Sequence, residues 1–75
     1  MIMMAHEELV RELEKGIKDE EEAIRYYDKL LNAADSVINA ETRYKFIRSM
    51  LFAIHNEEVF HKRKLQAILE TLKSG

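Results

Sequence analysis

Apolar residues recur along this 75-residue chain at alternating steps of three and four, and almost nothing in the sequence interrupts that spacing. The chain has no proline, and its two glycines are Gly16 and the terminal Gly75. Steps of three and four place side chains on one face of an α-helix, and proline and glycine are the residues that most often end a helix. The chain is also rich in Glu, Lys, Leu, Ala and Ile. These features together predict an all-α fold.

The spacing forms two long series that a polar stretch separates. The first predicts a helix over about 5–34, and the second predicts a helix over about 41–73. Between them, the segment ADSVINAET is rich in short polar side chains that favour turns, and Asp35 or Asn39 is a candidate cap for the second helix. A short connection makes two helices an antiparallel hairpin. We therefore expect one domain over residues 1–75, built as a two-helix hairpin.

A single hairpin leaves apolar side chains of both helices in water. Phe46, Met50 and Phe60 add large groups beside the main series of the second helix. A chain of this size seldom encloses a core without a disulfide, a metal or a partner, and this one has no cysteine. We therefore expect two hairpins to pack as a homodimeric four-helix bundle, or as a higher homo-oligomer.

The composition also narrows the classes of partner. A formal net charge of −2 gives no net attraction to nucleic acid or to an anionic membrane. The segments HKRK and RYKFIR place basic residues beside aromatic ones, but no continuous basic stripe follows from them. Residues 1–5 are too short for a signal peptide or a membrane span. We expect a soluble cytoplasmic protein that binds neither nucleic acid nor membrane.

Three polar residues occupy positions that the apolar series would otherwise hold. The first series has Glu20 as its one non-apolar member, and the second has Glu58 and His61, within EVFH. At a rise of about 1.5 Å per residue, the three lie within about one turn of the same level in an antiparallel hairpin. Buried carboxylates without a counter-charge are costly. The full series are 13, 17, 20, 24, 27, 31 and 34, then 44, 47, 51, 54, 58, 61, 65, 68 and 72.

This polar layer has the composition of a metal site. In a twofold dimer, two Glu20 and two Glu58 carboxylates would balance two divalent cations. Glu58 and His61, three residues apart, can reach one metal, and Glu20 from the neighbouring helix completes a half-site. Carboxylates with one imidazole per metal suit iron or manganese, although zinc could take their place in a crystal. Glu57 stays open as the alternative ligand, but Glu58 continues the apolar series and is preferred.

At this point the residues resemble a known family, the ferritin-like di-iron carboxylate proteins. The likeness rests on Glu20 with Tyr27 seven residues later in EEEAIRYY, and on EVFH in the next helix. Residues 17–34 and 47–72 are similar to half of a rubrerythrin four-helix bundle and to the hairpin of the encapsulated ferritins. The resemblance implies two irons per dimer and, as an alternative to the open cytoplasm, a location inside a protein shell. The cysteine-rich rubredoxin segment of the rubrerythrins has no counterpart here.

The resemblance also implies a role for each residue. Glu20 would be a terminal carboxylate ligand, Glu58 a bridging ligand and His61 the nitrogen ligand, while Tyr27 would hydrogen-bond near the centre. These roles suggest a di-iron oxidoreductase of the ferroxidase or peroxidase type, which oxidises Fe(II) or reduces O2 or peroxide. The alternative is a non-catalytic helical dimerisation or adaptor module whose polar residues set register and partner choice. His6 and His55 are interpreted as surface or interface residues.

Overall fold

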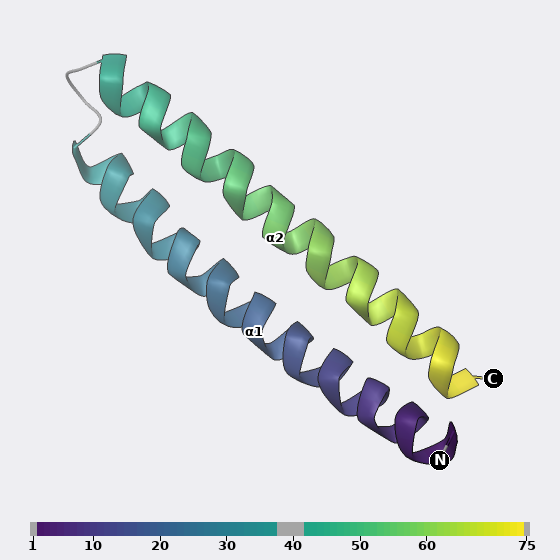
Figure 1. Ribbon diagram of the computed structural model, residues 1–75. Coiled ribbons are helices and arrows are strands. Elements are labelled where there is room, and N and C mark those ends of the chain that lie inside the picture. Colours follow the sequence, from purple (N-terminus) through teal and green to yellow (C-terminus); the bar gives the residue numbers. More distant parts are fainter. Residues whose placement is uncertain (1, 38–41, 75) are drawn as a thin grey trace.

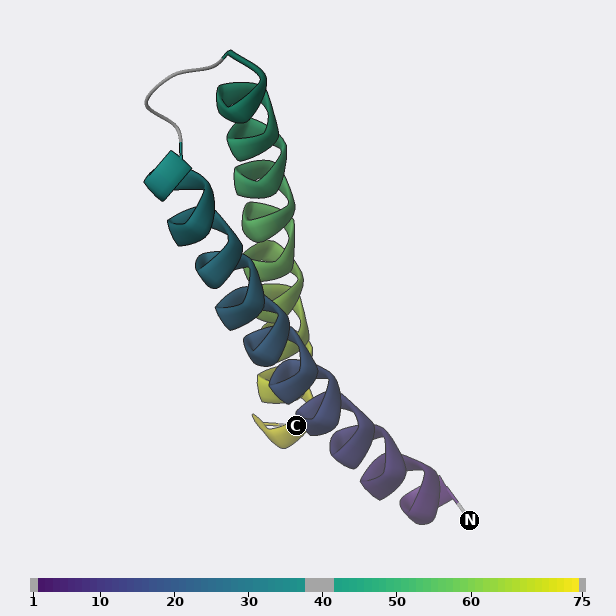
Figure 2. The same ribbon diagram turned by 90° about the vertical axis from the view of Figure 1, so that its left-hand side faces the viewer.

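Two long helices make up the structure. The computed structural model describes the backbone of residues 2–37 and 42–74, and the side chains of residues 5–36 and 45–74. Helix α1 (Ile2–Val37) and helix α2 (Thr42–Ser74) run antiparallel and pack side by side (Figure 1). The predicted all-α hairpin is therefore confirmed. In the view turned by 90°, the two helices cross, and the first turns of α1 extend away from the C-terminal end of α2 (Figure 2).

Helix α1 runs without a break through its glycine and ends three residues after the predicted position 34. Helix α1 passes through Gly16, whose φ is not positive. At its C-terminal end, the Ser36 hydroxyl donates a hydrogen bond to the Ala33 carbonyl, 2.7 Å away, so this polar side chain is satisfied within the helix. Asp35 lies inside α1 and accepts a hydrogen bond from Arg48 of α2, so the prediction that it caps α2 is wrong. The other candidate cap, Asn39, lies outside the described residues.

The core between the two helices is thin. Among the side chains that the structure describes, those of Leu13 and Leu31 are buried, at 8% and 9% exposed. The molecule is 59 Å long, and its radius of gyration is 17.1 Å. A compact domain of this length would have a radius of gyration of about 11 Å. Neither helix, over its described residues, has an apolar stretch long enough to cross a membrane.

The apolar series expected from the sequence accounts well for α1 and only in part for α2. Every member of the α1 series, from Leu13 to Ala34, is at least partly buried. In α2, residues 51, 54, 58, 65 and 72 are partly buried as well. Three other members of the α2 series, Ile47, His61 and Ile68, are exposed. Packing against α1 therefore covers part of the α2 series and leaves a second row of it in water.

Candidate metal centre

The structure brings the three polar members of the two series together. Glu20 comes from the middle of α1, and Glu58 and His61 come from successive turns in the middle of α2. One donor atom from each of the three residues, a carboxylate oxygen or an imidazole nitrogen, lies within 4.8 Å of the other two. Two carboxylates and one imidazole are thus positioned by the packing of the helices alone.

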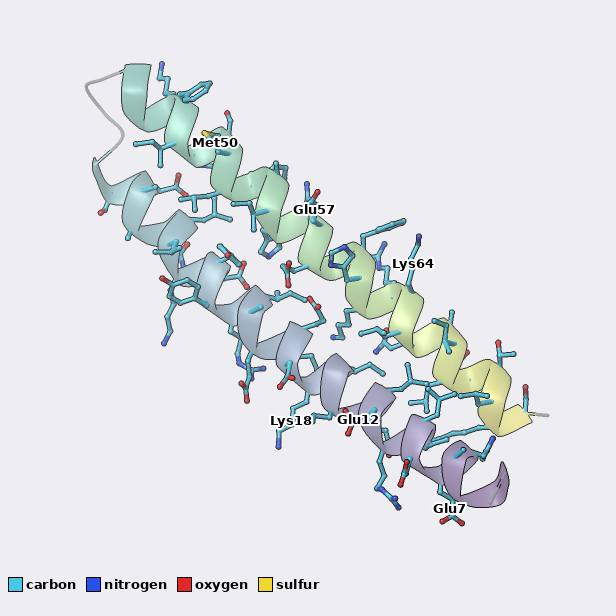
Figure 3. The ribbon with its side chains drawn as sticks, viewed as in Figure 1. Glu7, Glu12, Lys18, Met50, Glu57 and Lys64 are labelled. Carbon is cyan, nitrogen blue, oxygen red and sulfur yellow. The ribbon has the colours of Figure 1, made fainter. Side chains whose placement is uncertain are left out.

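Glu58 and Glu57 lie on different faces of α2. Glu58 is partly buried and belongs to the cluster with Glu20, whereas Glu57 is exposed. Figure 3 shows Glu57 on the side of α2 that is turned away from α1, in a row with Met50 and Lys64. Of the two alternatives that the sequence left open, Glu58 is the carboxylate that faces α1.

The spacing between Glu58 and His61 suits an ion better than a direct contact. His61 Nδ1 lies 4.0 Å from Glu58 Oε1, which is too far for a hydrogen bond. Two ligand atoms that each lie about 2.1 Å from a shared ion can be at most about 4.2 Å apart. The pair therefore has room for a metal ion between its two donor atoms. The His61 side chain is 51% exposed, so one side of the site is open.

Glu20 faces Glu58, and the charge of His61 lowers the pKa of Glu20 by less than the Glu58 carboxyl and burial together raise it. The Oε2 of Glu20 is buried and has no hydrogen-bond partner among the described residues. Two ionised carboxylates can only accept hydrogen bonds, so they cannot satisfy each other unless one of them carries a proton. The hydrogen bond that a shared proton makes with Glu58 raises the pKa of Glu20 above its ordinary value, and burial and the Glu58 charge raise it further. The pair therefore needs either a proton or a cation.

Tyr27 is partly buried on α1, seven residues beyond Glu20. Its ring lies edge-on against the ring of Tyr26, with the ring centroids 5.4 Å apart and the planes at 71°. No side-chain hydrogen bond among the described residues involves Tyr27. Its role beside a metal centre thus stays a prediction.

A feature that the sequence interpretation missed runs along one edge of the hairpin. The sequence predicts a surface or interface position for His55, but its side chain is only 19% exposed, and its Nε2 lies 2.9 Å from Asp28 Oδ1. The signal was present in the sequence, because acidic residues recur every seven positions on α1, at 14, 21, 28 and 35, and basic residues do so on α2 at 48, 55 and 62, with Lys73 eleven positions later. Among the described side chains, four pairs form what we call the ionic edge: Glu14–Lys73, Glu21–Lys62, Asp28–His55 and Asp35–Arg48.

Comparisons of this chain with protein-family models, with curated proteins and with solved structures found no match. The resemblance to the ferritin-like di-iron proteins therefore rests on the local pattern of Glu20, Tyr27 and EVFH.

Proposed function

We propose that this protein binds metal as a di-iron carboxylate protein, with a centre that two copies of the hairpin share. Glu20, Glu58 and His61 of each chain would be the ligands. The observation that carries the proposal is the meeting of these three side chains, with donor atoms within 4.8 Å of one another. Exposed acidic clusters are common on proteins, but here Glu20 Oε2 is buried and lacks a hydrogen-bond partner. A bound cation would satisfy that oxygen.

The donor set fits iron or manganese. Carboxylates and imidazole suit these ions, while the absence of cysteine rules out the thiolate ligands typical of structural zinc sites. Divalent metal ions take about four to six ligands, so the three donors of one chain do not complete a coordination sphere. A second copy would supply three more. The four glutamates of the two chains would then balance the charge of two divalent ions.

The chain's residues would prepare the site, and the metal would supply the redox chemistry. When bound, iron would transfer electrons to O2 or peroxide as it is oxidised from Fe(II) to Fe(III). Glu20 and Glu58 would neutralise the ions, and their partial burial would limit the access of water. His61 would fix the nitrogen position at the open side, and the Tyr27 hydroxyl would orient a carboxylate. Both the ferroxidase and the peroxidase reaction would use this arrangement.

The test compares two adjacent glutamates of α2. Glu58→Ala removes a proposed ligand, and Glu57→Ala removes an exposed carboxylate from the neighbouring position. In anaerobic titration with Fe(II), we expect the wild type and Glu57→Ala to bind about two irons per dimer, as a shared dinuclear centre requires. Glu58→Ala should bind well below that number, and stopped-flow oxidation of its added Fe(II) should fall toward the uncatalysed rate.

The same titration distinguishes the ways in which the proposal can fail. If Glu57→Ala is the damaging change, the ligand assignment in α2 is wrong. If neither change alters binding, the metal proposal fails, and the non-catalytic dimerisation or adaptor module takes its place. Metal analysis of protein purified without added metal gives an independent check, because an adaptor would carry no stoichiometric iron or manganese.

A further inference from the structure

The two edges of the contact between α1 and α2 differ in chemistry. On the ionic edge, each step of seven residues on α1 is matched by a step of seven on α2, from Asp35–Arg48 to Glu21–Lys62. Each helix also carries a row of residues on the other side of the face that contacts its neighbour. Because the two helices are antiparallel and packed side by side, these two rows must lie together along the opposite edge of the hairpin. We call this the apolar edge, and its members are Leu9, Gly16, Ala23 and Leu30 on α1 and Ile47, Ile54, His61 and Ile68 on α2.

The apolar edge is only partly covered by the hairpin itself. Leu9 is 47% exposed, Ile47 44% and Ile68 48%. His61 is the one polar member of the edge, and its side chain is 51% exposed. A row of apolar groups in which three large side chains are exposed, with a proposed metal ligand at its centre, is typical of an interface rather than of a solvated surface.

The exposed area of the chain also calls for a partner. The hairpin has an accessible surface of 6056 Å². A folded monomeric protein of this mass would expose about 4,800 Å². The excess is about 1,200 Å², and a standard interface takes about 800 Å² from each partner. A second hairpin of the same length would therefore cover what this chain leaves exposed.

We propose that the apolar edge is the docking surface for a second copy of this chain, with the ionic edge left in water. The inference rests on the proposed function in one respect, since it names the surface that completes the shared centre. Glu20 and Glu58 lie at the middle of α1 and α2. Two hairpins that overlap along their full length would therefore bring their clusters to the same level, whichever direction the second copy runs.

The position of His61 makes a second copy the fitting occupant. His61 lies on the apolar edge and belongs to the cluster with Glu20 and Glu58, so a partner on that edge faces the open side of the site. An identical chain brings the same three donors to that side. The ionic edge offers no comparable surface, because its charged groups are paired within the chain and their burial would cost solvation.

The test uses two exposed apolar residues of α2 that lie on opposite flanks. Ile68 is on the apolar edge and is 48% exposed, whereas Phe52 is 49% exposed and lies on the ionic flank, between Arg48 and His55. Sedimentation equilibrium with a chelator present should show a wild-type dimer. Ile68→Glu should weaken the dimer by about a hundredfold or more, since a twofold interface loses each side chain twice. Phe52→Glu should leave the dissociation constant unchanged.

A second variant guards against a folding defect in the first. Leu9→Glu changes the other helix, one turn before the buried Leu13 and near the N-terminal end of α1, and should also dissociate the dimer. Circular dichroism at each concentration separates dissociation, which a higher concentration reverses, from misfolding. If Ile68→Glu misfolds, Leu9→Glu alone decides the question.

The proposal is overturned if the wild type is a folded monomer at micromolar concentration. It is also overturned if Phe52→Glu dissociates the dimer as strongly as the apolar-edge variants do. Because these measurements are made without metal, a dimer that binds no iron leaves this inference standing while the proposed function fails. A chain that is monomeric with the chelator and dimerises only when it binds two irons gives the reverse result, because the shared centre then stands while the apolar edge fails as a docking surface.

Discussion

At the scale of single residues, Glu20 is one of two described residues with a buried polar side-chain atom that has no hydrogen-bond partner, the other being His55. The Oε2 of Glu20 is buried without a hydrogen-bond partner, and the nearest acidic group on the other helix is the Glu58 carboxyl. A carboxylate in this position destabilises the metal-free fold, because it loses hydration without gaining a counter-charge. Titratable groups in such positions are often found where a protein binds or reacts. The strain belongs to the metal-free chain, so it can be measured there.

The pKa of Glu20 leads to a prediction for the metal-free protein. The contact with Glu58 and burial raise that pKa in the folded chain. The folded state therefore holds the Glu20 proton more tightly than the unfolded state, whose glutamate pKa is about 4.3. The stability that the fold gains from binding this proton is fully present at a pH below the Glu20 pKa of the unfolded chain. It is lost as the pH rises through the Glu20 pKa of the folded chain. At neutral pH, Glu20→Gln should therefore be more stable than the wild type, by on the order of 1 kcal/mol, because a neutral amide can donate a hydrogen bond to Glu58.

Denaturant unfolding with a chelator, repeated from acid to neutral pH, measures this difference. The advantage of Glu20→Gln over the wild type should disappear near the unfolded glutamate pKa, at about pH 4. Glu22→Gln is the matched control, because Glu22 is exposed on the same helix, and it should follow the wild type at every pH. A pH-independent difference, or an equal effect of Glu22→Gln, would contradict the buried position of Glu20.

The same residues show how far the sequence could predict the site. The steps of three and four, together with the rise of a helix, were enough to place Glu20, Glu58 and His61 at one level. The partner of His55 was harder to predict. Asp28 lies on the other helix, and pairing the two requires the exact register of the hairpin, which short-range spacing does not contain. The register can be seen in the sequence only after the two rows of the ionic edge are aligned.

At the scale of the helices, the ionic edge aligns α1 with α2 more than it stabilises them. In three of its four pairs, both side chains are at least one quarter exposed, and in the fourth Asp28 is 56% exposed. Exposed ion pairs contribute only about 0–1 kcal/mol each. Their arrangement still opposes a slip along the helix axis, since a shift by one turn would separate all of them.

The ends of the helices were harder to predict than their positions. The hydroxyls of Ser36 and Ser74 donate hydrogen bonds to backbone carbonyls three residues earlier in their own helices, so these polar side chains do not end the helices.

Gly16 provides a prediction about α1. It lies inside the helix with an ordinary φ, and a Cβ added there would lie 3.4 Å from Leu65 Cδ1, which is within normal packing distance. Glycine in a helix interior costs about 0.5–1 kcal/mol relative to alanine. Gly16→Ala should therefore stabilise the protein by that amount and raise the midpoint of thermal unfolding by a few degrees. If Gly16→Ala instead lowers the midpoint and weakens the dimer in sedimentation, the glycine is needed for close approach of the second copy.

At the scale of the whole molecule, the hairpin is a long structure with a very small interior. It extends 59 Å, yet Leu13 and Leu31 are the buried side chains among those described. The sequence could predict the hairpin from its two apolar series, and the structure confirms it, while the pairing of two hairpins stays a prediction. The sequence could not separate the row that packs against α1 from the row that is left exposed, because both belong to one broad apolar face of α2. The separation appears only when the two helices are placed together.

Binding of metal to such a molecule should change its stability, which gives a last prediction. A ligand that binds only the folded state stabilises it in proportion to the logarithm of its concentration, by about 2.7 kcal/mol at one hundred times the dissociation constant. Mn(II) is a suitable probe because it does not react with O2 as Fe(II) does. Adding Mn(II) to metal-free protein near neutral pH should raise the midpoint of thermal unfolding of the wild type and of Glu57→Ala. It should leave Glu58→Ala unchanged, because that variant lacks a carboxylate that faces Glu20.

The metal-free Glu58→Ala variant should also start from a higher midpoint than the wild type, since it has lost the repulsion with Glu20. A wild-type midpoint that neither chelation nor Mn(II) moves would show that the cluster holds a proton in place of a metal.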